Sequence, residues 1–338
     1  MRFSDLLEQD QLRRALTEDL SSGAFSHAYL ITGPSGSGKR TWGRVLACAL
    51  LCRERRGAEP CGNCISCRSF SAGRCPALFS LEPENRKIKT EQIREIRGQF
   101  YFEGMNRVCL ICRAEQMTAE AASSLLKILE DPPPGLYFIL LAEQAQQLHS
   151  TIVSRCRRYS MQPLTAGAIE SILQQQGVSQ PGTTSLAVRM SKGLPGLALA
   201  IAQDPSYEIR LREAGDLSAS LAAGKLKPRE IIGQAAALSE REDLFSLLEN
   251  VYLYYRDWLI WQLCRSESLL INPAQHNHSF KNISPRLLET VLEIIHETLK
   301  ELMLTNVNRR LAVERMLIEI QRRYLYAQSD RCAFPAGR

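Results

Sequence analysis

A glycine-rich segment near the N-terminus constrains the fold more than any other feature of the chain. An apolar run at 28–32 is followed by Gly-Pro-Ser-Gly-Ser-Gly-Lys at positions 33–39 and then by a helical pattern that begins at Arg40. Glycines at this spacing let backbone N–H groups face a phosphate, and the lysine adds a positive charge. A strand, such a loop and a helix in succession predict a phosphate loop in a parallel α/β domain.

The rest of the first half repeats this alternation of short apolar runs and helical patterns, which is typical of a parallel sheet flanked by helices. Thr118 can cap the best-marked helix, and Pro132 ends it. We predict strands at 28–32, 78–81, 108–112, 137–141 and 158–161, and helices at 40–51, 90–101 and 119–129.

After Met161 the strand signals end, and the remaining sequence is helical. The most apolar stretch, 244–264, carries Glu249, Arg256 and Asp257, which favours a core helix over a membrane span. We expect an α/β domain at 1–163, a segment of short helices at 164–204, a domain of long helices at 207–328 and a tail at 329–338.

Composition excludes several classes of protein. The 338 residues are 45% hydrophobic and 23% charged, which rules out a disordered chain, a fibrous repeat and a small disulfide scaffold. Lys+Arg 42 against Asp+Glu 36 leaves a net charge of +6, which suits nucleic-acid contact without requiring it. Acidic residues stand where a signal peptide needs an apolar run, so we expect a cytoplasmic protein whose 11 cysteines bind metal or pack, rather than form disulfides.

The groups that hydrolyse nucleotide are missing around this loop. A Ser or Thr should follow Lys39 to hold Mg²⁺, but Arg40 stands there, and Thr41 lies about 100° further around the helix. The strand predicted at 108–112 ends in Cys112 and Arg113 instead of acidic residues. We therefore expect no hydrolysis, while ATP binding stays open. The residues that would contact its phosphates are Gly33, Gly36, Gly38, Lys39 and Thr41.

A cluster of cysteines predicts a zinc site. Cys61, Cys64 and Cys67 follow one another at intervals of three residues, and a tetrahedral zinc site needs four ligands. Cys52 upstream and Cys75 downstream are both candidates for the fourth. A redox pair would leave the third cysteine without a purpose. We expect four further cysteines to pack in the core: Cys48, Cys109, Cys112 and Cys264.

Two further motifs point to a known family. Residues 118–133 resemble the "A-x-N-A-L-L-K-x-L-E-E-P-P" helix of bacterial clamp-loader subunits, and Ser154-Arg155-Cys156 matches their Ser-Arg-Cys motif. Together with the phosphate loop and the cysteines, these make the chain similar to the delta-prime subunits of DNA polymerase III clamp loaders over essentially its whole length. The segment from Asn306 is similar to that family's last helix.

This resemblance implies an AAA+ (RecA-like) parallel-sheet domain with an inserted zinc module at about 52–75, a helical lid and a C-terminal helical collar. It also implies that Cys52, and not Cys75, completes a structural Zn²⁺ site with Cys61, Cys64 and Cys67. The positions that carry catalytic groups in the motor subunits of the family correspond here to Arg40, Cys112-Arg113, Ala142-Glu143 and Gly196.

Of the catalytic groups of the family, only the arginine of the Ser-Arg-Cys motif remains in this chain. The resemblance implies that this residue, Arg155, acts in trans on the nucleotide of a neighbouring subunit. The function implied is that of a non-hydrolysing partner in loading a sliding clamp onto primed DNA. The partners implied are gamma/tau motor subunits and a delta subunit in a hetero-pentamer, together with the clamp and the DNA.

Two other functions stay open at this point. An active gamma/tau-like AAA+ ATPase would need an acidic residue at Cys112 or Arg113. A zinc-dependent nucleic-acid-binding module would need basic and aromatic residues around the cysteines, where the nearby aromatics are Phe70 and Phe79.

Overall fold

The computed structural model describes residues 2–23, 25–99, 106–178, 180–224, 227–272, 283–304 and 307–333. The chain divides into two compact units, Met1–Ala202 and Gln203–Arg338, each of which is considered by itself. Three predicted features lie outside the described residues: the end of the helix expected to reach position 101, Asn306, and the last five residues of the tail.

The first unit is built on a five-stranded parallel sheet with the order β2-β3-β4-β1-β5. The sequence predicted all five strands, three of them with ends shifted by one residue. β1 lies between β4 and the edge strand β5, and the loop that follows it leaves the carboxyl edge of the sheet, where ligands bind in open α/β folds. The strands are β1 (Ala28–Thr32), β2 (Leu78–Leu81), β3 (Arg107–Ile111), β4 (Leu136–Ala142) and β5 (Arg157–Ser160).

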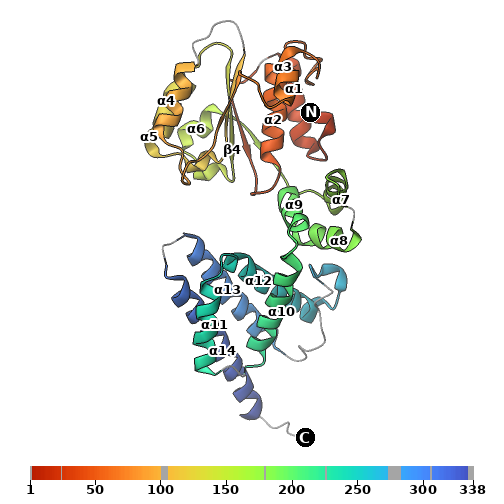
Figure 1. Ribbon diagram of the computed structural model, residues 1–338, viewed down its shortest axis with the longest axis vertical. Coiled ribbons are helices and arrows are strands. Elements are labelled where there is room, and N and C mark those ends of the chain that lie inside the picture. The colour runs from red at the N-terminus through yellow and green to blue at the C-terminus, as the bar shows by residue number, and fades with distance from the viewer. Residues whose placement is uncertain are drawn as a thin grey trace. The chain divides into compact units, whose positions relative to one another are not determined.

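Helices cover both faces of this sheet, which confirms the predicted α/β class (Figure 1). A sheet between two helical layers needs strands that are apolar on both sides, and every residue of β3 is buried. On one face lie α1 (Asp10–Ser22), α2 (Lys39–Leu51) and α3 (Ile65–Ser71), and on the other α4 (Thr90–Gln99), α5 (Ala119–Glu130) and α6 (Ser150–Arg155).

Gly43 brings α2 close to the sheet. A Cβ atom at this position would lie 3.0 Å from Cδ1 of Leu110 on β3 and 3.1 Å from Cδ2 of Leu141 on β4. The absence of a side chain therefore allows the helix to pack against the centre of the sheet. This contact fixes the start of α2, and with it the phosphate loop, over the strand ends.

A buried polar group ties α1 to the edge strand β5. The side chain of Asp19 is 2% exposed, forms an ion pair with Arg157 and accepts a hydrogen bond from the hydroxyl of Tyr159. Burial and the bond to Asp19 raise the pKa of Tyr159 above its usual range, so the hydroxyl keeps its proton. A buried carboxylate needs such partners, and they hold the segment that follows α6 in place.

Three short helices follow the sheet and form a segment that we call the lid: α7 (Ala166–Gln175), α8 (Pro181–Met190) and α9 (Pro195–Gln203). The turn before α9 passes very close to the start of this segment. The N–H of Leu164 donates to the carbonyl of Gly193 over 2.8 Å, and a Cβ at Gly193 would lie 2.5 Å from the Leu164 carbonyl oxygen. Gly193 also has φ +80°, so a glycine is required here.

The second unit is helical in its described part, as predicted. Its core surrounds Tyr255 and Trp258, which stack with ring centroids 5.8 Å apart. Cys264, which we expected in a core, is exposed at the last residue of α12. The helices are α10 (Tyr207–Ala222), α11 (Pro228–Ser239), α12 (Leu244–Cys264), α13 (Pro285–Leu304) and α14 (Arg309–Ala333).

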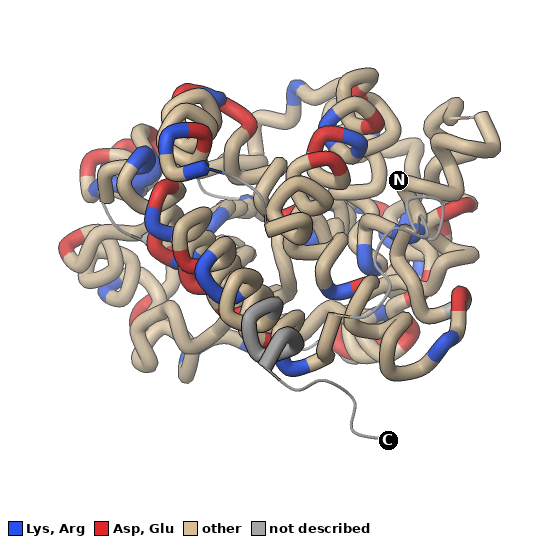
Figure 2. The backbone as a smooth tube through the Cα atoms, turned by 90° about the horizontal axis from the view of Figure 1, so that it is seen from below, with Lys and Arg blue, Asp and Glu red and all other residues tan. Residues whose placement is uncertain are grey.

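Within the described ranges, no helix is both long and apolar enough to cross a membrane. Lys and Arg are interspersed with Asp and Glu along the helices, and they do not gather on one basic face in the view of Figure 2.

The packing of Gly43 gives a first test. Gly43→Val should lower the free energy of unfolding of the first unit by about 1–3 kcal/mol, because its methyl groups overpack against Leu110 and Leu141. Gly167→Val on α7 is the control, since a Cβ there meets nothing within 4 Å. Urea unfolding measures both. A Gly43→Val protein as stable as the control would contradict this account of α2.

Candidate functional site

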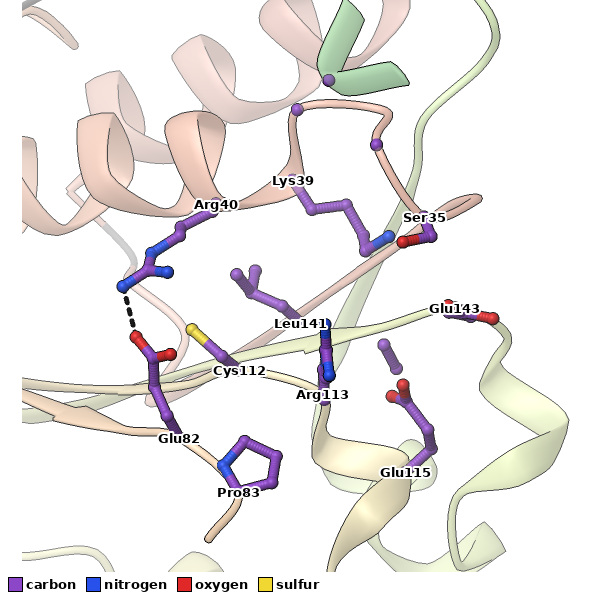
Figure 3. Close-up of a pocket in the computed structure, with 14 residues that line it drawn as sticks. Ser35, Lys39, Arg40, Glu82, Pro83, Cys112, Arg113, Glu115, Leu141 and Glu143 are labelled. Atoms are coloured by element: carbon purple, nitrogen blue, oxygen red, sulfur yellow. Dashed lines mark hydrogen bonds and ion pairs between the residues drawn. The ribbon is translucent and has the colours of Figure 1, made fainter. Parts of the chain in front are cut away.

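A cavity of about 410 Å³ opens at the carboxyl ends of the strands, in front of the phosphate loop (Figure 3). Its walls come from the loop and α2, from the residues that follow β2, β3 and β4, and from the lid. The lining residues are Ser35, Gly36, Gly38, Lys39, Arg40, Glu82, Pro83, Cys112, Arg113, Glu115, Leu141, Ala142, Glu143 and Gly196.

The loop has the backbone that its glycines predict. Gly36 and Gly38 adopt φ +78° and +91°, a region that other residues rarely enter. The N–H of Gly33 donates to the carbonyls of Ala142 and Glu143, each over 3.2 Å, which holds the base of the loop against the end of β4. Of the residues predicted to contact phosphates, Gly36, Gly38 and Lys39 line the cavity. Gly33 lies at the base of the loop and is not among the lining residues.

Lys39 is folded onto the loop itself. Its Nζ donates to the carbonyls of Gly33 and Pro34 over 2.5 and 2.8 Å. Burial lowers the pKa of Lys39, although the carboxylates of Glu143 and Glu115 oppose that shift. A phosphate in the loop would have to draw the ammonium away from these two carbonyls.

An ion pair occupies the side of the cavity where a motor subunit would hold Mg²⁺. Arg40 pairs with Glu82, the residue directly after β2 (Figure 3). Thr41 is exposed and is not among the residues that line the cavity. Cys112 and Arg113 follow β3 and offer a thiol and a guanidinium where an acidic pair is needed. These side chains differ from the Ser or Thr and the acidic pair that hold Mg²⁺ and activate water in phosphate-loop ATPases.

Three carboxylates, Glu82, Glu115 and Glu143, line the cavity. Glu82 and Glu115 were not predicted from the sequence, whereas Glu143 belongs to the Ala142-Glu143 pair that the resemblance had placed at a catalytic position. Each follows a strand of the sheet closely, and this position was the available signal, because the carboxyl ends of parallel strands share one edge. One oxygen of Glu115 is buried and has no hydrogen-bond partner among the described residues. The carboxylates offset the charges of Lys39, Arg40 and Arg113, so the cavity carries both signs.

The lid lies directly against the loop. The N–H of Gly196 donates to the carbonyl of Gly36 over 2.8 Å, and a Cβ at Gly196 would stand 2.9 Å from the Gly36 Cα. Gly196 is the position at which the resemblance places the sensor arginine of motor subunits. With no side chain there, the first turn of α9 approaches the loop backbone.

A second site is formed by four cysteines at the end of α2. The sulfur atoms of Cys52, Cys61, Cys64 and Cys67 all lie within 4.8 Å of one another, and Cys75 is not in this group. Two of the separations, Cys52–Cys64 and Cys61–Cys67, are 4.0 and 3.9 Å. A tetrahedral ion with bonds of about 2.3 Å to sulfur separates its ligands by about 3.8 Å. The arrangement can therefore hold such an ion.

Backbone N–H groups donate to three of these sulfur atoms, while burial raises the pKa of Cys52 and Cys67. The N–H groups of Cys61, Cys64 and Cys67 donate to the sulfur atoms of Cys52, Cys61 and Cys64 over 3.3, 3.3 and 3.4 Å. Burial acts to raise the pKa of Cys64, but the N–H of Cys67 and further hydrogen bonds outweigh it and lower that pKa to about 6. Thiolates are the form that binds metal.

The cysteine cluster is joined to the rest of the unit by polar contacts. The N–H groups of Phe3 and Ser4 donate to the carboxylate of Glu59 over 2.9 and 3.0 Å. The guanidinium of Arg44 on α2 lies 5.2 Å from the ring centroid of Phe70 on α3. Because Cys52 is also the C-cap of α2, the cluster anchors the helix that begins at the phosphate loop.

Arg155 ends α6 and does not line the cavity of its own chain. Its Nη2 donates to Oε1 of Glu130 at the end of α5 over 2.8 Å, and its Nη1 donates to the carbonyl of Thr151 over 3.1 Å. The side chain is 35% exposed. The structure thus places the predicted site residues in three locations: the loop cavity, the cysteine cluster and the α5–α6 junction.

Comparisons with known proteins agree with the motifs. A family model described as "DNA polymerase III, delta subunit" matches residues 8–165. A delta-prime subunit from Bacillus subtilis is 28% identical, covering 93% of this chain and 96% of the relative. The Escherichia coli delta-prime subunit is 26% identical and covers 90% and 92%.

Tau subunits match as well, but this chain spans only part of them. The Bacillus subtilis tau subunit is 24% identical over 90% of this chain and 59% of its own length. A solved gamma subunit-related protein from Thermotoga maritima aligns with 94% of this chain and 100% of that one at a TM-score of 0.45 and 16% identity. The matches to delta-prime subunits extend over nearly the full length of both chains, which supports the assignment of this chain to the delta-prime subunits of DNA polymerase III clamp loaders.

Proposed function

We propose that this chain is the non-hydrolysing AAA+ subunit of its clamp loader and that it supplies Arg155 to the nucleotide of a neighbouring motor subunit. The contrast between two sites carries this proposal. The positions in the chain's own cavity at which the resemblance expects metal- and water-binding groups carry Arg40, Cys112 and Arg113, while an arginine with unused donors stands outside that cavity. Such a subunit contributes to a neighbour's chemistry and performs none of its own.

The chemistry expected of Arg155 is electrostatic. Negative charge develops on the phosphoryl group during transfer, and an arginine from an adjacent chain stabilises it. A guanidinium has a planar set of N–H donors that can pair with two phosphate oxygens at once. In this role Arg155 is fixed by the fold of one subunit and acts on the substrate of the next.

The partners follow from the relatives. Several are named as tau or gamma subunits of DNA polymerase III, and we infer that this chain assembles with such motor subunits and with a delta subunit in a hetero-pentamer. The work of the complex would be to place a sliding clamp on primed DNA. Gly33, Gly36, Gly38 and Lys39 could still hold the phosphates of ATP, which this chain would leave unhydrolysed.

Zinc is the metal that fits the four cysteines. Sulfur ligands in a tetrahedral arrangement favour Zn²⁺, and four protein ligands leave no open position for a substrate. Cys52, Cys61, Cys64 and Cys67 would hold it, and the ion would join α2 to α3. This makes the role structural.

The two alternatives have less support. An independent AAA+ ATPase needs a carboxylate at Cys112 or Arg113. Glu82, which lies beside Arg40, is already paired with that arginine. A zinc-dependent nucleic-acid module needs a basic face, whereas positive and negative residues are interspersed in the described helices (Figure 2).

The isolated chain should not turn over ATP. Arg40, Cys112 and Arg113 leave Mg²⁺ and the attacking water without partners. Release of inorganic phosphate by the purified protein, with Mg²⁺ present, is the measurement. Turnover above background that disappears in Lys39→Ala would contradict the proposal.

The purified protein should contain one zinc ion per chain. Cys52→Ser should lose the metal and lower the unfolding temperature, because it removes a ligand and frees the end of α2. Cys75→Ser, outside the cluster, is the matched control and should keep both. Elemental analysis and thermal unfolding report the two effects. Full zinc content in Cys52→Ser would refute the ligand set.

Arg155→Ala should lower ATP turnover and clamp loading by the reconstituted complex. Arginines that act in trans contribute about 10³–10⁵ in rate at the site they serve. Arg155→Lys should rescue poorly, because lysine lacks the planar fork. Arg158→Ala, an exposed arginine on β5, is the control. Undiminished turnover with Arg155→Ala would defeat the proposed role.

A further inference from the structure

We propose that Glu130 is a positioning residue for Arg155: it holds the guanidinium so that its free N–H edge is ready for a phosphate of the neighbouring subunit. This inference rests on the proposed function of Arg155 and adds a residue to which no role has been given. Glu130 does not touch the nucleotide in this scheme and acts only through the arginine.

The geometry fixes the guanidinium at two points. Nη2 of Arg155 donates to Glu130 Oε1 over 2.8 Å, and Nη1 donates to the carbonyl of Thr151 over 3.1 Å. The first contact comes from the end of α5 and the second from one turn back on α6. Two contacts from different elements determine the plane of the group, which a single contact would leave free to rotate.

The remaining donors of Arg155 are available. A guanidinium carries five N–H bonds, and the two contacts use one on each terminal nitrogen. One further N–H on each terminal nitrogen and the Nε–H therefore remain, and the side chain is 35% exposed. These can pair with phosphate oxygens while the bonds to Glu130 and Thr151 persist.

Both supports are themselves held by the core. Ile128 and Leu129, next to Glu130, are 6% and 2% exposed, and Ile152 on α6 is fully buried. The end of α5 and the body of α6 are therefore fixed against the sheet. Orienting a long, flexible side chain before the reaction reduces the cost of ordering it during the reaction.

Glu130 has little to contribute to the fold. Its side chain is 54% exposed, and exposed ion pairs have small effects on stability. An effect on turnover without an effect on stability would therefore separate positioning from folding.

The test uses Glu130→Gln in the complete complex with motor and delta subunits, clamp and primed DNA. Glutamine keeps an oxygen acceptor but removes the charge. We expect the Arg155-dependent part of kcat, the difference between wild-type and Arg155→Ala complexes, to fall about two- to five-fold, the range of an exposed ion pair. KM for ATP, zinc content and the unfolding temperature should not change. Asp131→Asn, the adjacent exposed carboxylate, is the control.

A double-mutant cycle completes the test. Glu130→Gln should cause no further loss in a complex that already contains Arg155→Ala. An unchanged or raised kcat with Glu130→Gln, or an equal loss in the Arg155→Ala background, would overturn the positioning role while leaving the role of Arg155 standing. A silent Arg155→Ala would remove the proposed function, and this inference with it.

Discussion

The packing of α2 against the centre of the sheet is the constraint on which two of the three sites depend. The helix begins at Lys39 in the phosphate loop, passes Leu110 and Leu141 at Gly43, and ends beside Cys52. One rigid element therefore places the loop over the strand ends and presents the first cysteine to the other three. The third site lies on the opposite layer, where α5 and α6 hold Arg155.

The charged groups of the cavity and of the α5–α6 junction differ in how far they are paired within the chain. The cavity retains the backbone of a phosphate loop, but Arg40 is paired with Glu82 and Lys39 is bonded to the loop's own carbonyls. Gly196 lets the lid contact the loop backbone directly. The positive charges of Lys39 and Arg40 are thus bonded to groups of the protein itself. Arg155, outside the cavity, is partly exposed and keeps unused N–H donors.

The sequence was informative where a feature is local. Apolar runs located the strands to within a residue. The spacing of Cys61, Cys64 and Cys67 predicted a cluster, because local backbone turns bring residues three apart together. Contacts between distant segments were not predictable in this way. Glu82 reaches Arg40 only because β2 ends and α2 begins at the same edge of the sheet, and Glu130 reaches Arg155 only because α5 packs beside α6. The expected burial of Cys264 was wrong, since the last buried residue of α12 is Trp258 and the end of the helix is exposed although its last residues are apolar.

The central claim is that Arg155 completes a site on another subunit, and the most direct measurement is structural. A structure of the assembled clamp loader with an unhydrolysable ATP analogue gives the separation between the Arg155 guanidinium and the γ-phosphate bound to the adjoining motor subunit. If Arg155 acts in trans, a terminal nitrogen should lie at hydrogen-bonding distance, about 2.7–3.2 Å, from a γ-phosphate oxygen. An ordered γ-phosphate whose contacts all come from other residues, with Arg155 well beyond that distance, would contradict the claim.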